Sequence, residues 1–439
     1  MTHLTVHEWG RVRVHNDGGA VPFGHFSRRQ ANALLAAARA HPLSGNEGTA
    51  ILSDHHRHLT ARQHVGVIAA PGCSLEILPK IDPDDAQDDA GIRRKLVRML
   101  DVALGLNIGD GQAAAMAKQD HTLLEILIRL FAERLFAEAK RGLPRAYMAQ
   151  QEDLPSLRGR LNVTRQFTHN AVRPDRLACK FDNLIADTPL LQIMKSCVLF
   201  LRRHAVAFET VRRLDELRFL LADVSDLSSN ALPWKKVKID RTNRRWETLY
   251  GLARLFLKRE WQSTHADATA RYGITLLFPM NKLFEAYITA LMKRALAGTN
   301  LTVHAQGGFL NCLIEEGENG EESFQTKPDI RIKDGERTIT VIDTKWKRIS
   351  NNSGDKKRGV SQADVYQMMA YARLYRPNEV MLLYPHHAGL SPTPLDTGYG
   401  MLGGGERLRI ASVDLLQMEG AIAGQLTNLF AFKGIIAEV

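Results

Sequence analysis

A predicted β-hairpin in the last third of the sequence constrains the fold more than any other feature. Residues 329–332 and 338–345 have the pattern of two strands, and the link Lys333-Asp-Gly-Glu336 contains an Asp-Gly pair, which is typical of tight hairpin turns. A helix is predicted before the hairpin over 280–296, another after it over 361–375, and then a strand over 380–384. This order of elements predicts an α/β domain.

The hairpin should bring charged side chains together. Because side chains alternate along a strand, Asp343 and Lys345 are expected on one face and Ile342 and Thr344 on the other. The turn folds Asp329 back to the level of Asp343, so two carboxylates and one ammonium group can meet at one strand end. An Asp-x-Lys motif on a strand most often forms a solvent-facing ion pair on an edge strand. The apolar residues just before Asp343 instead indicate a buried strand, where an unpaired carboxylate is costly.

Such a pair of carboxylates suits Mg²⁺, which takes oxygen ligands and usually keeps waters and substrate phosphate as the others. A bound metal would activate water and polarise a phosphodiester, while Lys345 orients the nucleophile or neutralises developing charge. Gln367 and Tyr371, four residues apart, should share one face of the helix over 361–375. Gln367 could hold a phosphate or base near the metal, or be a polar residue at the rim of the helix.

The rest of the chain divides into two further regions. The fold class predicted for the whole chain is therefore α/β, in a multidomain α+β arrangement. A length of 439 residues favours two to four domains. We predict a β-rich module over 1–88, a mainly helical region over 89–265 and the α/β domain over 266–439, with a linker at 150–156 and a boundary at 263–272. Strands are expected over 4–14 and 65–80, and helices over 89–104 and 121–140.

Composition and missing motifs limit the function. Lys and Arg outnumber Asp and Glu by 58 to 48, which favours polyanionic partners without proving one. The 4 cysteines are too scattered for a disulfide framework or a paired metal site, so a reducing cytoplasm is expected, and no stretch reads as a membrane span. No G-x-x-x-x-G-K-[S/T] motif occurs, so the chain itself is not expected to hydrolyse a nucleotide.

Several motifs resemble known nucleases. Pro328-Asp329, Asp343-Thr-Lys345 and Gln367-x-x-x-Tyr371 resemble the PD-(D/E)-x-K superfamily, in its RecB-like branch. The chain is also similar, over most of its length, to the McrC family, the nuclease subunit of the McrBC modification-dependent restriction system. The stretches that carry this likeness are Leu154-Pro-Ser-Leu-Arg-Gly-Arg160, Phe181-Asp-Asn-Leu-Ile-Ala-Asp187, Asn281-Lys-Leu-Phe-Glu285, Val341-Ile-Asp-Thr-Lys-Trp346, Tyr366-Gln-Met-Met-Ala-Tyr371 and Leu382-Leu-Tyr-Pro-His386.

The resemblance implies a restriction-endonuclease-like domain in which Asp329 and Asp343 bind Mg²⁺ and Lys345 is catalytic. Glu285 stands where related nucleases place a helix carboxylate near the metal, although a surface acid on an amphipathic helix is equally compatible. The segment 157–161, Leu-Arg-Gly-Arg-Leu, is similar to a family signature. Either a structural turn at Gly159 or phosphate contacts by its two arginines would explain that signature.

The resemblance also implies partners. These are an McrB-like AAA+ GTPase hexamer, which binds GTP and recognises double-stranded DNA with a modified cytosine, and that DNA itself. The β-rich module should contact the hexamer, with the loop over 53–63 as a candidate. A double-strand break needs two active sites, so nuclease subunits or whole complexes are expected to dimerise. Five residues of a basic loop could track the DNA backbone, or form an ordinary solvated loop: Lys347, Arg348, Lys356, Lys357 and Arg358.

Two other functions fit the same residues. The chain could be a stand-alone RecB-like nuclease that cuts ends or branches without a motor. It could instead be mainly an activator and scaffold of the GTPase, with a weak nuclease site.

Overall fold

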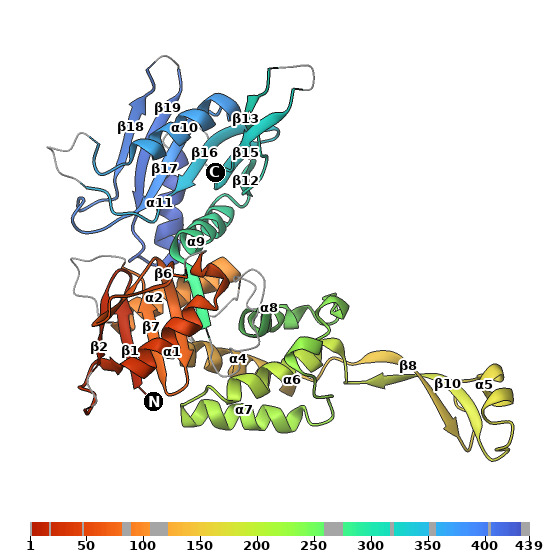
Figure 1. Ribbon diagram of the computed structural model, residues 1–439. Helices are drawn as coiled ribbons and strands as arrows, with labels where there is room; N and C mark the ends of the chain where they lie inside the picture. The colour runs from red at the N-terminus through yellow and green to blue at the C-terminus, as the bar shows by residue number, and fades with distance from the viewer. Residues whose placement is uncertain are drawn as a thin grey trace. The chain divides into compact units, whose positions relative to one another are not determined.

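The computed structural model describes residues 2–16, 19–45, 48–80, 89–105, 122–258, 275–316, 320–350, 357–402 and 405–431. The predicted boundary at 263–272 and the predicted DNA-binding residue Lys356 lie outside these ranges. The chain forms two compact units, residues 1–123 with 261–439 (the first unit) and residues 124–260 (the second unit) (Figure 1). Both contain helices and strands, as a mixed α and β protein should. In the described ranges, no helix is long and apolar enough to cross a membrane.

The first unit begins with two small sheets around one core. Their strand orders are β1-β7-β6-β11 and β3-β2-β5-β4. The elements from residue 2 to 104 are β1 Thr2–His7, β2 Arg11–His15, β3 His25–Ser27, α1 Arg28–Arg39, η1 Pro42–Ser44, β4 Leu52–Asp54, β5 His58–Ala61, β6 His64–Ala70, β7 Cys73–Leu78 and α2 Asp89–Leu104. The single strand predicted over 4–14 is wrong, because Trp9 has a φ of 64° and separates β1 from β2.

A strand from the second half of the chain completes the first of these sheets. β11 (Thr275–Pro279) pairs antiparallel with β6, with Thr275 opposite Ile68, and every residue of β11 is buried. Gly66 has a φ of 132°, and a Cβ there would lie 1.9 Å from the carbonyl oxygen of Leu276, so only glycine fits this close approach. Helix α9 (Met280–Ala295) starts directly after β11 and packs against α2.

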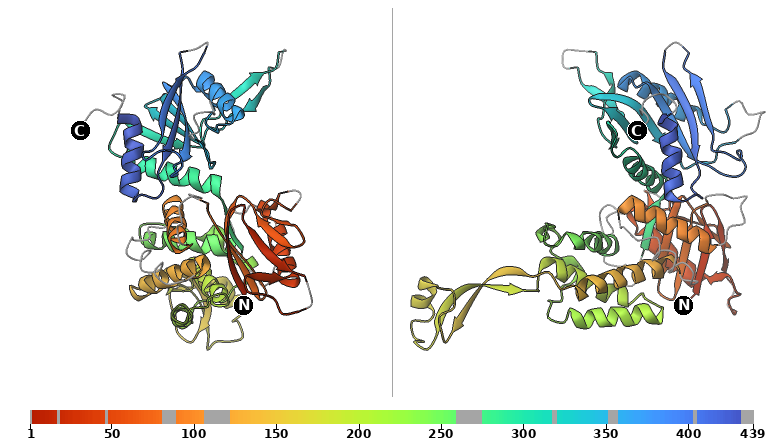
Figure 2. Two further views of the ribbon diagram at one scale, coloured as in Figure 1. Left: turned by 90° about the vertical axis from the view of Figure 1, so that its left-hand side faces the viewer. Right: turned by 180° about the vertical axis from the view of Figure 1, so that it is seen from behind.

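The remainder of the first unit is built on a six-stranded sheet of order β12-β15-β16-β17-β19-β18. Helix α10 covers one face, and α9 with α11 covers the other (Figure 2). The elements are β12 Leu301–Ala305, β13 Asn311–Ile314, β14 Glu322–Gln325, β15 Ile330–Asp334, β16 Arg337–Thr344, α10 Gln362–Tyr375, β17 Glu379–Pro385, β18 Asp396–Gly400, β19 Arg407–Val413 and α11 Glu419–Ala431.

The predicted hairpin of this sheet is confirmed. β15 and β16 are antiparallel with Ile330 opposite Ile342. Gly335 in the turn has a φ of 55°, a left-handed conformation that glycine adopts easily and that explains the Asp-Gly pair. β16 and β17 are parallel and are connected by α10, so the sheet contains both parallel and antiparallel pairs. The helix prediction over 361–375 is confirmed as well, because Ser361 caps α10 by accepting a hydrogen bond from the backbone N–H of Asp364.

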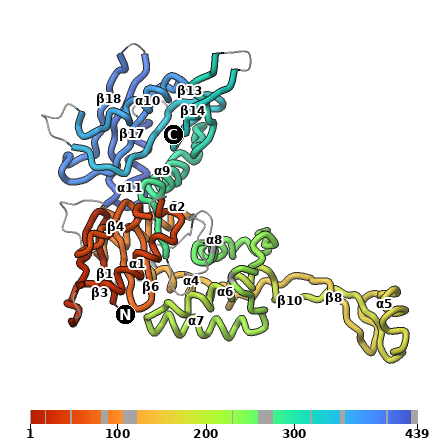
Figure 3. The backbone as a smooth tube through the Cα atoms, viewed as in Figure 1, coloured from red at the N-terminus to blue at the C-terminus, as the bar shows by residue number. Residues whose placement is uncertain are grey.

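The second unit consists of packed helices and a long arm, whose sheet has the strand order β8-β10-β9 (Figure 3). Its elements are α4 Leu123–Lys140, β8 Ala146–Leu154, β9 Arg160–Leu161, α5 Val163–Thr168, β10 Leu177–Ile185, α6 Pro189–Arg202, α7 Phe208–Leu220, η2 Ser229–Ala231, η3 Trp234–Lys236, η4 Arg244–Trp246, α8 Glu247–Ala253 and η5 Arg254–Lys258. The prediction of a linker at 150–156 is wrong, because most of that segment lies in β8, which pairs with β10 along nine residues.

The segment 157–161 forms a tight turn on the arm. Gly159 has a φ of 69°, and a Cβ there would lie 2.5 Å from the carbonyl oxygen of Lys180. The guanidinium of Arg158 stacks 4.1 Å from the ring centroid of Phe181. Both observations favour the structural explanation of this signature over phosphate contact. The arm also exposes apolar side chains, including Phe167 at 74% and Val172 at 87%.

Candidate functional site

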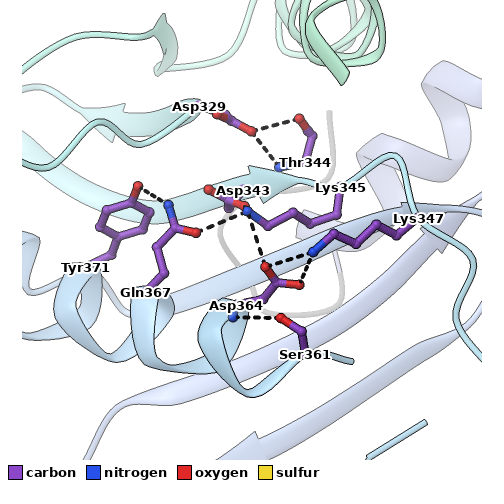
Figure 4. Close-up of polar contacts among 9 residues, drawn as sticks. All are labelled: Asp329, Asp343, Thr344, Lys345, Lys347, Ser361, Asp364, Gln367 and Tyr371. Atoms are coloured by element: carbon purple, nitrogen blue, oxygen red, sulfur yellow. Dashed lines mark hydrogen bonds and ion pairs between the residues drawn. The ribbon is translucent and has the colours of Figure 1, made fainter. Parts of the chain in front are cut away.

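The end of β16 brings the predicted acid and lysine into contact (Figure 4). Asp343 is buried at 2% exposure, and its Oδ2 lies 2.6 Å from Nζ of Lys345. The backbone N–H of Lys345 donates to the carbonyl of Leu383, which extends the ladder between β16 and β17 past the last strand residue. Both side chains lie on the α10 side of the sheet, as alternation along the strand predicts.

Asp329 lies at the start of β15, directly beside Asp343. The pairing of Ile330 with Ile342 places these two acids opposite each other on neighbouring strands. Oδ2 of Asp329 accepts hydrogen bonds from the backbone N–H and the hydroxyl of Thr344, each at 2.8 Å. These bonds fix the carboxylate at the strand end, so the structure brings together the three residues that the sequence singled out.

Helix α10 holds the lysine from the other side. Oε1 of Gln367 accepts from Nζ of Lys345 at 3.1 Å, and its Nε2 donates to the hydroxyl of Tyr371 at 2.7 Å. Gln367 therefore orients Lys345, a different contact from the phosphate or base considered for it. Asp364 was not predicted, yet its Oδ1 lies 3.6 Å from Nζ of Lys345. Its position three residues before Gln367, on the same helix face, was the available signal.

The remaining predicted acid, Glu285, extends from α9 and is half-buried. Its Oε1 accepts from Nε2 of Gln306 at 2.6 Å, and the backbone N–H of Gln306 donates to the carbonyl of Asp329 at 3.0 Å. Gln306 follows β12 and has a φ of 45°. It thus ties Glu285 to the strand that carries Asp329. No sequence pattern pointed to Gln306, because the contact depends on how α9 and the sheet pack.

The acids of this site repel one another. Burial, together with repulsion by Asp329, raises the pKa of Asp343 to about 6. Burial and the charge of Asp329 likewise raise the pKa of Glu285 to about 7. Burial also raises the pKa of Asp329. Burial alone would lower the pKa of Lys345, but the carboxylates around it, Asp343 foremost, outweigh burial and raise it. Lys345 is therefore held as a cation, and the site still carries an excess of negative charge.

This donor set fits a magnesium ion. No group of three or more His, Cys, Asp or Glu side chains in the described residues is close enough to hold a metal by itself. Mg²⁺ commonly takes only one or two carboxylates and completes its shell with water and phosphate, and Asp329 with Asp343 offers that number. The raised pKa values of both acids show a buried charge that a divalent cation would offset.

The predicted basic loop is partly engaged within the protein. Nζ of Lys347 lies 3.0 Å from Oδ2 of Asp364, which lowers the pKa of that acid despite its burial. Arg358 has a φ of 50°, and its guanidinium donates to the hydroxyl of Thr397 at 3.0 Å. Arg348 and Lys357 are exposed. Two of these four residues thus contact other side chains of the protein, and the loop follows directly after Lys345.

Comparison with known proteins places this architecture in a family. Residues 59–385 match the family model described as McrBC 5-methylcytosine restriction system component. The type IV methyl-directed restriction enzyme EcoKMcrBC of Escherichia coli K12 is 22% identical over 304 residues, covering 67% of this chain and 85% of that protein.

Solved structures show the same fold. A half-complex from a tetradecameric assembly of Thermococcus gammatolerans McrB AAA+ hexamers with bound McrC matches with a TM-score of 0.74 and 20% identity, covering 98% of this chain and 100% of that one. A second structure, of the Thermococcus gammatolerans McrBC complex, matches with a TM-score of 0.55 and 23% identity, covering 67% and 88% of the two chains. Since the family model spans most of the sequence, the chain belongs to the family of McrBC 5-methylcytosine restriction system components.

Proposed function

We propose that this chain is the Mg²⁺-dependent DNA endonuclease subunit of a GTP-dependent restriction complex directed at modified cytosine. The observation that carries the proposal is the meeting of Asp329, Asp343 and Lys345 at one strand end, with two acids on neighbouring strands and a cationic lysine against one of them. Membership of the McrBC family supports the restriction role. The free cysteines of the described chain are compatible with action in the cytoplasm.

The proposed reaction is hydrolysis of a phosphodiester. Water attacks phosphorus, the bond to the leaving oxygen breaks, and that oxygen takes up a proton. Asp329 and Asp343 would hold the metal, which supplies activation of water and charge neutralisation at phosphate when bound. Lys345, protonated and fixed by Gln367, would stabilise the negative charge that develops on the phosphoryl oxygens. Glu285, with a pKa near neutrality, would accept or donate a proton at the edge of the site.

The proposed partner is an AAA+ GTPase hexamer, which would bind GTP, recognise modified double-stranded DNA and be stimulated by this chain. The solved complexes that share this fold contain McrB hexamers with bound McrC, which supports the pairing. We propose the N-terminal module as one contact, including the turn between β4 and β5. The exposed apolar side chains of the arm, Phe167 and Val172 among them, offer a second contact. The basic loop after Lys345 would face the DNA backbone, and two nuclease subunits would act in one double-strand break.

The test combines the purified chain, its AAA+ partner, GTP, Mg²⁺ and methylated duplex DNA. Cleavage is expected with wild type and should be lost with Asp343→Ala and with Lys345→Met, while GTP turnover of the mixture stays stimulated. Wild-type cleavage by Asp343→Ala would remove the assigned site. Cleavage of unmodified DNA without nucleotide would favour a stand-alone nuclease. Stimulated GTP turnover without any cleavage by wild type would leave the role of activator and scaffold.

A further inference from the structure

A hydrogen bond between the first and last thirds of the chain ends beside the proposed catalytic lysine. Nε1 of Trp346, the residue after Lys345, donates to Oε2 of Glu8 at 3.0 Å. Glu8 directly follows β1 and is buried at 2% exposure. The same Oε2 accepts from the backbone N–H of Lys80 at 3.1 Å, just past β7. The carboxylate is therefore fixed to the N-terminal sheet and also binds the residue that follows Lys345.

Trp346 stands where the backbone turns away from the site. The backbone N–H of Lys347 donates to the carbonyl of Lys345 at 2.9 Å, so Trp346 is the central residue of a three-residue turn. The lysines on both sides of it contact the same acid, Asp364, at 3.6 and 3.0 Å. A shift of Trp346 would therefore move both lysine backbones together.

The indole also contacts the helix that carries the other candidate acid. Its ring lies 5.5 Å from that of Phe284, which immediately precedes Glu285 on α9. This helix is itself continuous with β11, the fourth strand of the N-terminal sheet. The strand with Lys345, the helix with Glu285 and the N-terminal sheet thus all meet at one side chain.

We propose that Trp346 is a positioning residue for DNA cleavage, and that its bond to Glu8 makes the position of Lys345 depend on the N-terminal sheet. The proposal rests on the nuclease function proposed above and adds a route by which the N-terminal module acts on the site. In the part of the chain that the structure describes, Oε1 of Glu8 has no hydrogen-bond partner. Loss of the indole donor would leave that buried carboxylate with one bond instead of two.

The experiment uses the full chain with its AAA+ partner, GTP, Mg²⁺ and methylated DNA. Trp346→Phe keeps a smaller aromatic ring beside Phe284 and removes the donor, and Glu8→Ala removes the acceptor. Each should lower kcat for cleavage about tenfold, because small displacements of a charged group are costly in catalysis, while KM for DNA stays unchanged. Glu8→Gln keeps an acceptor and should retain most of the activity. Glu336→Ala, a side chain 101% exposed at the far end of the same hairpin, is the matched control.

Two further readouts separate positioning from general damage. The double variant should lose no more activity than either single variant, because both remove one interaction. Amide hydrogen exchange at Lys345 and Lys347 should rise in both single variants, while exchange in the strand β17 stays unchanged. Wild-type kcat and unchanged exchange in Trp346→Phe would overturn the proposal, as would additive losses. Cleavage at the wild-type rate by an Asp343→Ala control would refute the active site assigned above, whatever Trp346 does.

Discussion

Replacing Asp343 with asparagine should abolish cleavage and, without metal, make the first unit more stable. Asp343 is 2% exposed, and burial with repulsion by Asp329 raises its pKa from 3.8 to about 6. The difference of about two pKa units, at 1.36 kcal/mol each, corresponds to about 3 kcal/mol that ionised Asp343 costs the folded state. This is an upper bound for the gain, because asparagine does not reproduce the contact with Lys345.

The sign of this effect gives a pH dependence. Above pH 6 the carboxylate is ionised in both the folded and the unfolded chain, so the folded state bears the full cost. Well below its ordinary pKa of 3.8 it is neutral in both, and the cost disappears. The stability of wild type in EDTA should therefore rise as the pH falls from 7 to 4, and Asp343→Asn should lack that component. At pH 7.5 the variant should unfold a few degrees higher in thermal melts.

Magnesium should reverse the order of the melting temperatures of wild type and Asp343→Asn. At the proposed site Mg²⁺ would bind the folded state alone, so it should raise the melting temperature of wild type but not of Asp343→Asn. Asp334→Asn is the matched control, because Asp334 is exposed and asparagine also suits the turn before Gly335. A variant that melts below wild type in EDTA at pH 7.5 would refute the reasoning, since the ion pair with Lys345 would then outweigh the cost of burial.

Three other substitutions test separate parts of the molecule. Gly159→Ala should strain the arm by about 1–3 kcal/mol or more, because φ is positive there and a Cβ would press on the carbonyl of Lys180. The strained arm should be cut faster by proteases. An unchanged rate of proteolysis would contradict the tight turn assigned to Gly159. Phe167→Ser should weaken binding to the AAA+ partner in calorimetry without changing the melting temperature, since its ring is 74% exposed, and an unchanged Kd would exclude this contact. Burial, opposed by hydrogen bonds from Lys80 and Trp346, raises the pKa of Glu8 to about 7, so wild type should gain stability as the pH falls from 8 to 5. Glu8→Gln should remove the part of that gain that comes from Glu8, and pH profiles identical to those of wild type would show that Glu8 is not buried as an acid.

The elements around the site were predictable because their signals are local. The Asp-Gly turn, the alternation around Asp343 and the capping serine at 361 each act within a few residues. The arm was missed for the opposite reason. A ribbon with solvent on both faces needs no apolar alternation, and β8 contains Gln150-Gln-Glu-Asp153 in its middle.

The supporting contacts of the site were beyond sequence reasoning. Asp364 was not predicted as a site residue, because its approach to Lys345 requires α10 to lie against the sheet. Gln306 depends on the packing of α9. The bond from Trp346 to Glu8 joins residues 338 positions apart, a distance over which no periodicity carries information. The sequence therefore predicted the residues proposed for the chemistry better than those that hold them in place.

The late arrival of β11 has a consequence for synthesis on the ribosome. β6 ends at Ala70, but the strand that pairs with its open edge, β11, begins only at Thr275. About 200 residues must be synthesised in between, which takes roughly 10–40 s at ordinary rates of translation. Until then the nascent protein carries an unpaired, apolar strand edge that other chains can join. Stalling between these two points should therefore favour aggregation. The N-terminal third, expressed as a fragment, would keep that open edge permanently.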